Sequence, residues 1–288
     1  MRPLSPFAIG ALLCALPVLG CSSSDAAPDT TASGGSTNQI CTAPGYHVDA
    51  DPLGVQQVNA LLVDQAGTAV PGVPVQVCGV NQCYYGNSNG VGRINVVVEE
   101  PLVLPVFKYG DGQDFAELGA PLDAAAAQDL GTVVALPLPT LADGAPFPKS
   151  GDLSHGDLTL HLGSSTSVTL DLLSYPDDEQ HVFRTVPVPL DRSTKALPPS
   201  FGFELAYGAA PLLTKFCPAA PLSVKNTLGW DPGTAVEVFI QGLDTNEQWA
   251  PYGTWVKVAD AEVSSDGSSI DTTSGGIPIL SSIALRRK

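Results

Sequence analysis

The chain has 288 residues, with 13 basic and 29 acidic side chains and a formal net charge of −16. This balance excludes nucleic acid as a predicted partner, because binding to phosphates needs basic side chains that displace counterions. Charged residues make up only 15% of the chain and apolar residues 44%. A chain of this length and composition can bury a large core in one or two domains.

The first twenty residues predict export from the cytosol. Arg2 precedes an apolar run over residues 7–19, which is interrupted by Gly10 and Pro17. As a helix this run would span about 20 Å, whereas the hydrocarbon core of a bilayer is about 30 Å thick. We therefore expect residues 1–20 to be a signal peptide and not a membrane span.

The end of this run is Val18-Leu19-Gly20-Cys21, which resembles the lipobox of bacterial lipoproteins. The resemblance implies cleavage between Gly20 and Cys21 and attachment of several acyl chains to Cys21, enough for a stable membrane anchor. Ser22 in the second mature position implies sorting to the outer membrane of a Gram-negative cell, facing either the periplasm or the outside. The implied partner is the membrane itself, and no cofactor is expected beyond this covalent lipid.

Residues 21–40 are nearly all small or polar after the cysteine, reading SSSDAAPDTTASGGSTNQI. Such a composition buries too little apolar surface to fold by itself. We expect a lipidated tether with a root-mean-square span of about 25 Å.

Residues 41–138 alternate apolar and polar side chains in short runs, which predicts strands buried on one face. Val73, Val75 and Val77 share one parity, as do Ile94, Val96 and Val98. Further strands are predicted at 58–63, 103–109 and 132–136. The four consecutive alanines within 123–130 predict one short helical turn.

Gly67, Val70 and Gly72 precede the first valine strand, and a turn at 87–92 precedes Arg93 and the second strand. This layout resembles the carboxypeptidase-regulatory-like, or transthyretin-like, modules of bacterial surface proteins. The resemblance implies an Ig-like or prealbumin-like β-sandwich of about seven strands, used for support or adhesion and without catalysis.

Residues 139–150 are rich in proline, and we interpret them as a linker because proline lacks the amide donor of a sheet. Alternation resumes over 151–288 and predicts a second antiparallel sandwich, so the expected fold class is all-β with two modules. Its predicted strand faces are Val168, Leu170 and Leu172; Phe201, Phe203, Leu205 and Tyr207; Val236, Val238 and Ile240; and Ile277, Ile279, Ile283 and Leu285. The order of 221–226, 232–234, Trp249, Trp255 and 275–277 resembles a C-terminal β domain of uncharacterised bacterial lipoproteins, which carries no known activity.

Four cysteines remain after Cys14 leaves with the signal peptide and Cys21 is acylated. In an oxidising compartment they favour two disulfides over a metal site, and three pairings are open. We favour Cys78 with Cys83, because the four residues between them suit a hairpin loop. Cys41 would then pair with Cys217.

Several motifs match catalytic or metal sites only in part. Ser88 lies in a G-x-S-x-G match, but a strand and not a helix follows it, against a nucleophile elbow. His155, His161 and His181 lack the spacing of metal ligands, and His155 and His161 would share a face if they were on one strand. The acidic run 177–179 lacks the spaced oxygens of a calcium loop. We predict neither a catalytic nor a metal site.

Trp249, Tyr252 and Trp255 allow two interpretations. They anchor a loop in the core, or their exposed rings stack on sugars. The leading hypothesis is a non-enzymatic, lipid-anchored envelope protein with a structural, adhesive or partner-binding role. The alternative is a carbohydrate-binding surface lipoprotein that uses these aromatic residues. A hydrolase or a metal-binding protein is less favoured.

Overall fold

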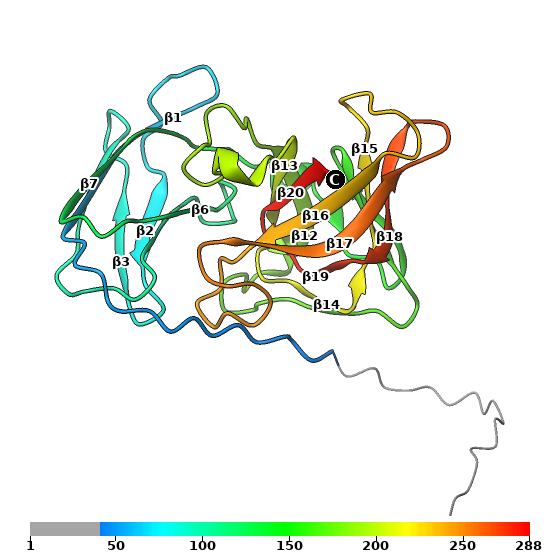
Figure 1. Cartoon of the computed structure of the whole chain (residues 1–288), viewed down its shortest axis with the longest axis horizontal. Helices are drawn as coiled ribbons and strands as arrows, with labels where there is room; N and C mark the ends of the chain where they lie inside the picture. The colour runs from blue at the N-terminus through cyan, green and yellow to red at the C-terminus, as the bar shows by residue number, and fades with distance from the viewer. Residues whose placement is uncertain (1–40) are drawn as a thin grey trace, which may run out of the picture. The chain divides into compact units, whose positions relative to one another are not determined.

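The computed structural model describes residues 41–288, and the predicted signal peptide and tether lie outside the described residues. The described chain contains 20 strands and three short 3-10 turns, which confirms the all-β class (Figure 1). The first group of strands is β1 (Gln57–Val63), β2 (Pro74–Cys78), β3 (Cys83–Asn87), β4 (Arg93–Val97), β5 (Val106–Tyr109), β6 (Leu118–Pro121) and β7 (Ala127–Val134).

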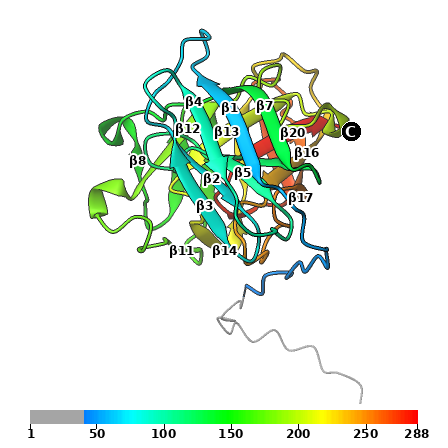
Figure 2. The ribbon, with the colours of Figure 1, turned by 90° about the vertical axis from the view of Figure 1, so that its left-hand side faces the viewer.

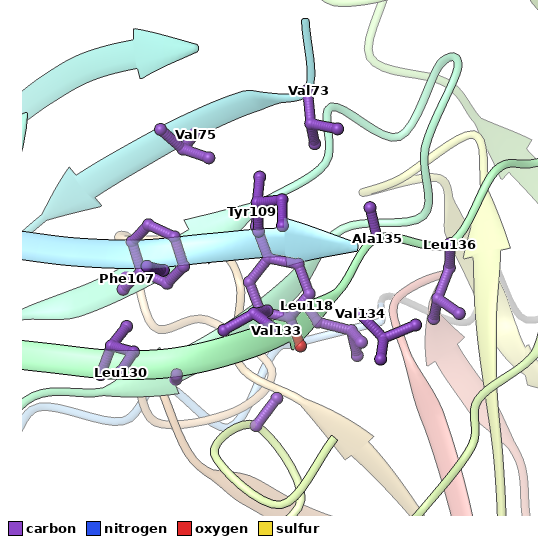
Figure 3. Close-up of a cluster of buried hydrophobic side chains, with 14 of the residues drawn as sticks. Val73, Val75, Phe107, Tyr109, Leu118, Leu130, Val133, Val134, Ala135 and Leu136 are labelled. Atoms are coloured by element: carbon purple, nitrogen blue, oxygen red, sulfur yellow. The ribbon is translucent and has the colours of Figure 1, made fainter. Parts of the chain in front are cut away.

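These seven strands form two sheets, of order β4-β1-β7 and β3-β2-β5-β6 (Figure 2). All their pairings are antiparallel except that between β1 and β7, which is parallel. Apolar side chains of both sheets form one buried cluster. In Figure 3, Phe107 and Tyr109 of β5 lie in the same cluster as Leu130 and Val133 of β7. Residues 41–138 thus form two sheets packed on a shared core, within one compact body that includes all the described residues, 41–288. We call residues 41–138 the first module and the rest of this body the second module, after the predicted division.

The predicted helical turn at 123–130 is wrong. Residues from Ala127 onward form β7, and its register places Val133 opposite Leu62 of β1. Leu130, Val133 and Val134 are buried in the core of the module. Pairing with β1 and burial of these side chains outweigh the helical preference of the alanines, which is worth only tenths of a kcal/mol per residue.

The remaining strands form a ten-stranded sheet and a small three-stranded sheet. Their order is β8-β12-β13-β20-β16-β17-β18-β15-β10-β9 in the large sheet and β11-β14-β19 in the small one. The bounds are β8 (Ala145–Pro146), β9 (Gly151–His155), β10 (Leu158–Leu162), β11 (Ser167–Thr169), β12 (Val182–Pro187), β13 (Leu205–Ala210), β14 (Lys215–Ala220), β15 (Leu222–Lys225), β16 (Ala235–Gln241), β17 (Trp255–Val263), β18 (Ser269–Gly275), β19 (Ile277–Ile279) and β20 (Ile283–Arg287).

The ten-stranded sheet curls until β9, at one end, meets β12, near the other. The amide of Thr185 donates to Nδ1 of His155 at 3.0 Å, and its hydroxyl donates to the carbonyl oxygen of His155 at 2.9 Å. A second apolar cluster fills the interior, with Leu160, Val238 and Ile283 among its buried residues. The sheet thus wraps around its core, in place of the two even layers of a simple sandwich.

Residues 139–150, interpreted as a linker, contain the 3-10 turn η1 (Leu141–Asp143) and β8. β8 pairs with β12, and Arg184 of β12 donates to the carbonyl oxygen of Pro139 at 3.0 Å. The segment is consequently held at the edge of the large sheet. The other 3-10 turns are η2 (Asp178–Gln180) and η3 (Pro199–Phe201).

The expected strand face of Val168, Leu170 and Leu172 is wrong at its end. β11 stops at Thr169, and Leu172 is 62% exposed while its neighbour Leu173 is 95% exposed. The carboxylate of Asp171 accepts from the amide of Leu173 and from the hydroxyl of Ser174, and these bonds form a turn. An aspartate that binds the backbone two residues on ends a strand in this way.

Two leucines of the same chemistry test this assignment of core and surface. Leu118 is fully buried in the first module and Leu173 is almost fully exposed. Leu118→Ala should lower the free energy of unfolding by about 2–5 kcal/mol, because it leaves a cavity. Leu173→Ala should change it by less than about 0.5 kcal/mol. Urea unfolding followed by circular dichroism measures both, and equal losses would contradict the assignment.

Candidate functional site: the tether root and the junction of the modules

The described chain begins at a covalent attachment to the second module. Cys41 forms a disulfide with Cys217 of β14, with 5.6 Å between their Cα atoms, as predicted from the sequence. Four residues later the amide of Gly45 donates to the carbonyl oxygen of Gln248 at 3.0 Å. The amide of Tyr46 donates to the carbonyl oxygen of Glu247 at 2.7 Å. We call residues 41–46 and their contacts with Cys217 and 247–248 the tether root.

The second predicted disulfide, Cys78–Cys83, is also present. Its cysteines are paired across the hairpin of β2 and β3, with 4.0 Å between their Cα atoms. The loop of 79–82 is closed by the amide of Gly79, which donates to the carbonyl oxygen of Gln82. This bridge strengthens one hairpin, whereas Cys41–Cys217 closes a loop across both modules.

Gly20 and Cys21, the predicted cleavage and lipid-attachment residues, lie outside the described residues. Within residues 41–288, no helix combines the length and apolar character needed to cross a bilayer.

The aromatic residues predicted either to anchor a loop or to bind sugar lie mostly inside the protein. Tyr252 is 4% exposed and Trp255 6% exposed, and Trp249 packs partly buried against the second core. The indole N–H of Trp255 donates to the carbonyl oxygen of Ala196 at 2.9 Å, and its ring packs edge-on against Phe203. The faces of Tyr252 and Trp255 are thus covered, and a sugar ring could not stack on them.

Trp255 belongs to the core of the first module although it lies on β17, and so does Phe239 of β16. The two modules therefore share apolar packing. Beside it, the side-chain amide of Gln241 accepts from the amide of Gly119 at 3.1 Å and donates to its carbonyl oxygen at 2.6 Å. The hydroxyl of Ser282 donates to the carbonyl oxygen of Glu117 at 2.9 Å. These buried bonds fix β6 against the second module.

Tyr175 adds a third connection at this junction. Its hydroxyl donates to the carbonyl oxygen of Gly112 at 3.2 Å and accepts from the amide of Leu212 at 2.8 Å. The side chain is 2% exposed, and burial raises its pKa well above the ordinary value. A single phenol thereby joins a loop of the first module to two loops of the second.

A buried ion pair lies next to Tyr175. Nζ of Lys108 is 3.1 Å from Oε1 of Glu117, and both side chains are about nine-tenths buried. They border a cavity of about 240 Å³, to which Asp111 and Leu243 also contribute. The pair satisfies both charges within the first module, so the cavity presents no unpaired charge from these two groups to a ligand.

Four neighbouring strands bring together a chain of polar groups that the sequence did not predict. Nδ1 of His161 is 2.8 Å from Oδ1 of Asp152, and Nε2 is 2.7 Å from Oγ of Ser223. These are the residue types of a serine-hydrolase triad. The hydroxyl of Ser223, however, donates to Oδ1 of Asp271 at 2.6 Å. Because that proton is directed at Asp271, His161 is not placed to remove it.

The other sequence candidates are engaged in structural bonds. The hydroxyl of Ser88 donates to the carbonyl oxygen of Val70 and accepts from the amide of Val73. His155 and His161 lie on separate strands, β9 and β10, so the condition for a shared face is not met. His181 contacts the carbonyl oxygen of Tyr175 at 2.8 Å. Among the described residues, no group of three or more His, Cys, Asp or Glu side chains is arranged to hold a metal ion.

The outer face of the β4-β1-β7 sheet is polar and hollowed. Asn59 of β1 is paired with Asn95 of β4 on one side and with Asp129 of β7 on the other. Arg93 and Thr132 flank Leu61 in the next row, and together these residues line a hollow of about 550 Å³. Amides, a carboxylate and a guanidinium offer both donors and acceptors, so this face suits a polar partner.

No protein-family model matches the chain, and no curated protein matches its sequence. The resemblances to lipoproteins and to transthyretin-like modules consequently remain predictions from the sequence.

The two disulfides should differ in what they contribute to stability. Cys41–Cys217 spans 176 residues and Cys78–Cys83 spans 5. By the loop-entropy model, removal of the first costs about 5 kcal/mol and of the second about 2 kcal/mol. Urea unfolding of the Cys41→Ser/Cys217→Ser and Cys78→Ser/Cys83→Ser double variants measures both losses. A larger loss for the short bridge would contradict a long closure across both modules.

Alkaline pH should destabilise the fold through its buried tyrosines. Burial raises the pKa of Tyr207 to about 12 and that of Tyr175 and Tyr252 further, while unfolded tyrosine ionises near 10. The folded state thus retains protons that the unfolded state loses, and stability falls as pH rises above about 10. Phenolate absorbance should show these groups ionising only with unfolding. Their ionisation near pH 10 in the folded protein would contradict their burial.

Proposed function

We propose that the protein is a non-enzymatic, lipid-anchored protein of the Gram-negative outer membrane whose β modules form a scaffold for a partner. The observation that carries the proposal is the Cys41–Cys217 disulfide at the end of the predicted tether. It would transmit the position of an anchor at Cys21 to the folded body. Two disulfides also accord with an exported chain, because such bonds persist in oxidising compartments.

The arrangement around Ser223 supports a role without catalysis. Its hydroxyl proton is directed at Asp271, and an activated serine needs a base that accepts this proton. The hydroxyl of Ser88 is bound to backbone groups in the same manner. Ser88 is the candidate nucleophile from the sequence motif, and Ser223 is the candidate from the chain of polar groups. The hydroxyl proton of each is donated to a structural acceptor.

Partner binding has its support in the polar hollow on β1, β4 and β7. Asn59, Asn95 and Asp129 lie side by side on adjacent strands, and all three line this hollow. A glycan or a polar protein surface matches this chemistry. The alternative of sugar stacking on Trp249, Tyr252 and Trp255 has no support at Tyr252 and Trp255, whose rings are buried, and Trp249 is partly buried.

Loss of the lipid should release the protein from the membrane. In detergent phase separation, the wild-type chain should enter the detergent phase and fractionate with the outer membrane. Cys21→Ser should move it to the aqueous phase, since several acyl chains are required for stable anchoring. Cys14→Ser is the matched control, because Cys14 belongs to the predicted signal peptide and should leave fractionation unchanged. Aqueous partition of the wild-type chain would overturn the proposed anchor.

A further inference from the structure

Leu172 and Leu173 form the only place in the described chain where two consecutive large apolar side chains are both exposed. We call residues 171–174 the leucine tip. Asp171 and Ser174 flank the two leucines in the sequence, so the leucines do not continue the apolar face of β11. Exposed apolar residues that protrude as a group mark contact sites for membranes or partners.

The leucine tip is held in a fixed shape. Asp171 accepts from the amide of Leu173 and from the hydroxyl of Ser174, and its carbonyl oxygen accepts from the amide of Tyr175 at 2.9 Å. Tyr175 is in turn bound to Gly112 and Leu212 in the junction of the modules. The leucines are thus presented by a braced turn, and insertion would cost little ordering of the backbone.

The tip follows directly on the strand that lies beside the tether root. Ser167 of β11 is paired with Cys217, the residue that holds Cys41. Figure 2 shows β11 and β14 next to each other, at the side where the described chain begins. Leu173 comes six residues after Ser167, so at the rise of an extended strand it lies within about 20 Å of Ser167. The spacing of about 5 Å between paired strands places it within about 25 Å of Cys217. The predicted tether has a span of similar size, about 25 Å.

Acidic side chains near the leucine tip indicate which kind of lipid surface it can contact. Asp177, Asp178 and Glu179 are exposed just after the tip, and Asp244 and Asp171 border an adjacent hollow that holds Lys215. The predominance of carboxylates disfavours an anionic lipid surface and is tolerated by a zwitterionic one.

We infer that the leucine tip inserts into the interfacial layer of a zwitterionic lipid surface on the membrane that carries the lipid anchor, and thereby sets the orientation of the body on the membrane. This inference rests on the proposed lipid anchor at Cys21. With the root held near the surface, the tip acts at high effective concentration, so two leucines suffice for contact.

The first test uses the lipidated chain in phosphatidylcholine vesicles with brominated acyl chains, which quench tryptophan on contact. Leu173→Trp should add emission that these vesicles quench. Leu228→Trp is the matched control, because Leu228 is 48% exposed in the loop between β15 and β16, and its emission should remain unquenched. Equal quenching of the two variants, or none, would overturn the inference. Protection of Leu173→Trp from iodide without vesicles would reveal a protein contact and overturn it too.

A second test separates this inference from the anchor. The full chain with Cys21→Ser lacks the effective concentration that the anchor supplies, so it should float only at high phosphatidylcholine concentration, through partition of the leucine tip. Adding Leu172→Ser and Leu173→Ser should weaken this partition at least about tenfold, which corresponds to 1.4 kcal/mol. Adding Leu228→Ser should leave it unchanged. If the leucine substitutions weaken flotation but the wild-type chain carries no lipid, the proposed anchor is refuted and the inference stands. If the wild-type chain is lipidated but the leucine substitutions leave flotation unchanged, the inference is refuted and the anchor stands.

Discussion

The disulfide between Cys41 and Cys217 is the constraint on which the organisation of this chain depends. It holds the first described residue on β14 of the second module, whereas the first strand, β1, belongs to the first module. The residues between them bind 247–248 and then pair with the first module through Leu53 and Leu102. A chain that enters at one module and folds into the other is thereby fixed to both. The site at which an upstream anchor would be attached to the folded body is therefore fixed by a covalent bond.

The junction of the modules connects the attachment at Cys41–Cys217 to the rest of the folded body. Gln241 satisfies both backbone groups of Gly119, and Trp255 and Phe239 extend the core of the first module with side chains of the second. Separation of the modules would expose the apolar surfaces of Trp255 and Phe239 to water. It would also break the hydrogen bonds of Gln241, which contribute about 0.5–1.5 kcal/mol each. A body braced in this manner presents its surfaces, including the leucine tip and the polar hollow, in one fixed arrangement relative to the tether root.

Local pattern was sufficient to predict the elements that depend on neighbouring residues. The alternation of Val73, Val75 and Val77 predicted β2 with its buried face, and the spacing of Cys78 and Cys83 predicted their hairpin. Prediction was wrong where a local preference met a distant contact. Ala127, the last of the four alanines before Leu130, begins β7 because β1 lies beside it. Leu172 matched the parity of a buried strand, but Asp171 ended the strand before it.

The candidate site was harder to predict because its bonds join residues far apart in sequence. Gln241 and Gly119 are separated by 122 positions, and a lone glutamine in a strand has no local mark of such a role. The chain of polar groups from Asp152 to Asp271 likewise needs the order β9-β10-β15-β18, which is set by the pairing of strands far apart in sequence. Consecutive leucines between polar residues, by contrast, were visible as Leu172-Leu173 and could have been recognised as a turn from the aspartate before them.

The central claim is that a lipid on Cys21 is linked, through the tether and the Cys41–Cys217 bridge, to a rigid β body. Mass spectrometry of the detergent-extracted protein, digested without reduction, tests it most directly. The account predicts an N-terminal peptide that begins at Cys21, carries a diacylglycerol and an acyl group, and continues through Cys41 into a disulfide with the peptide of Cys217. An N-terminal peptide with an unmodified Cys21, or a Cys41 joined to another cysteine, would contradict it.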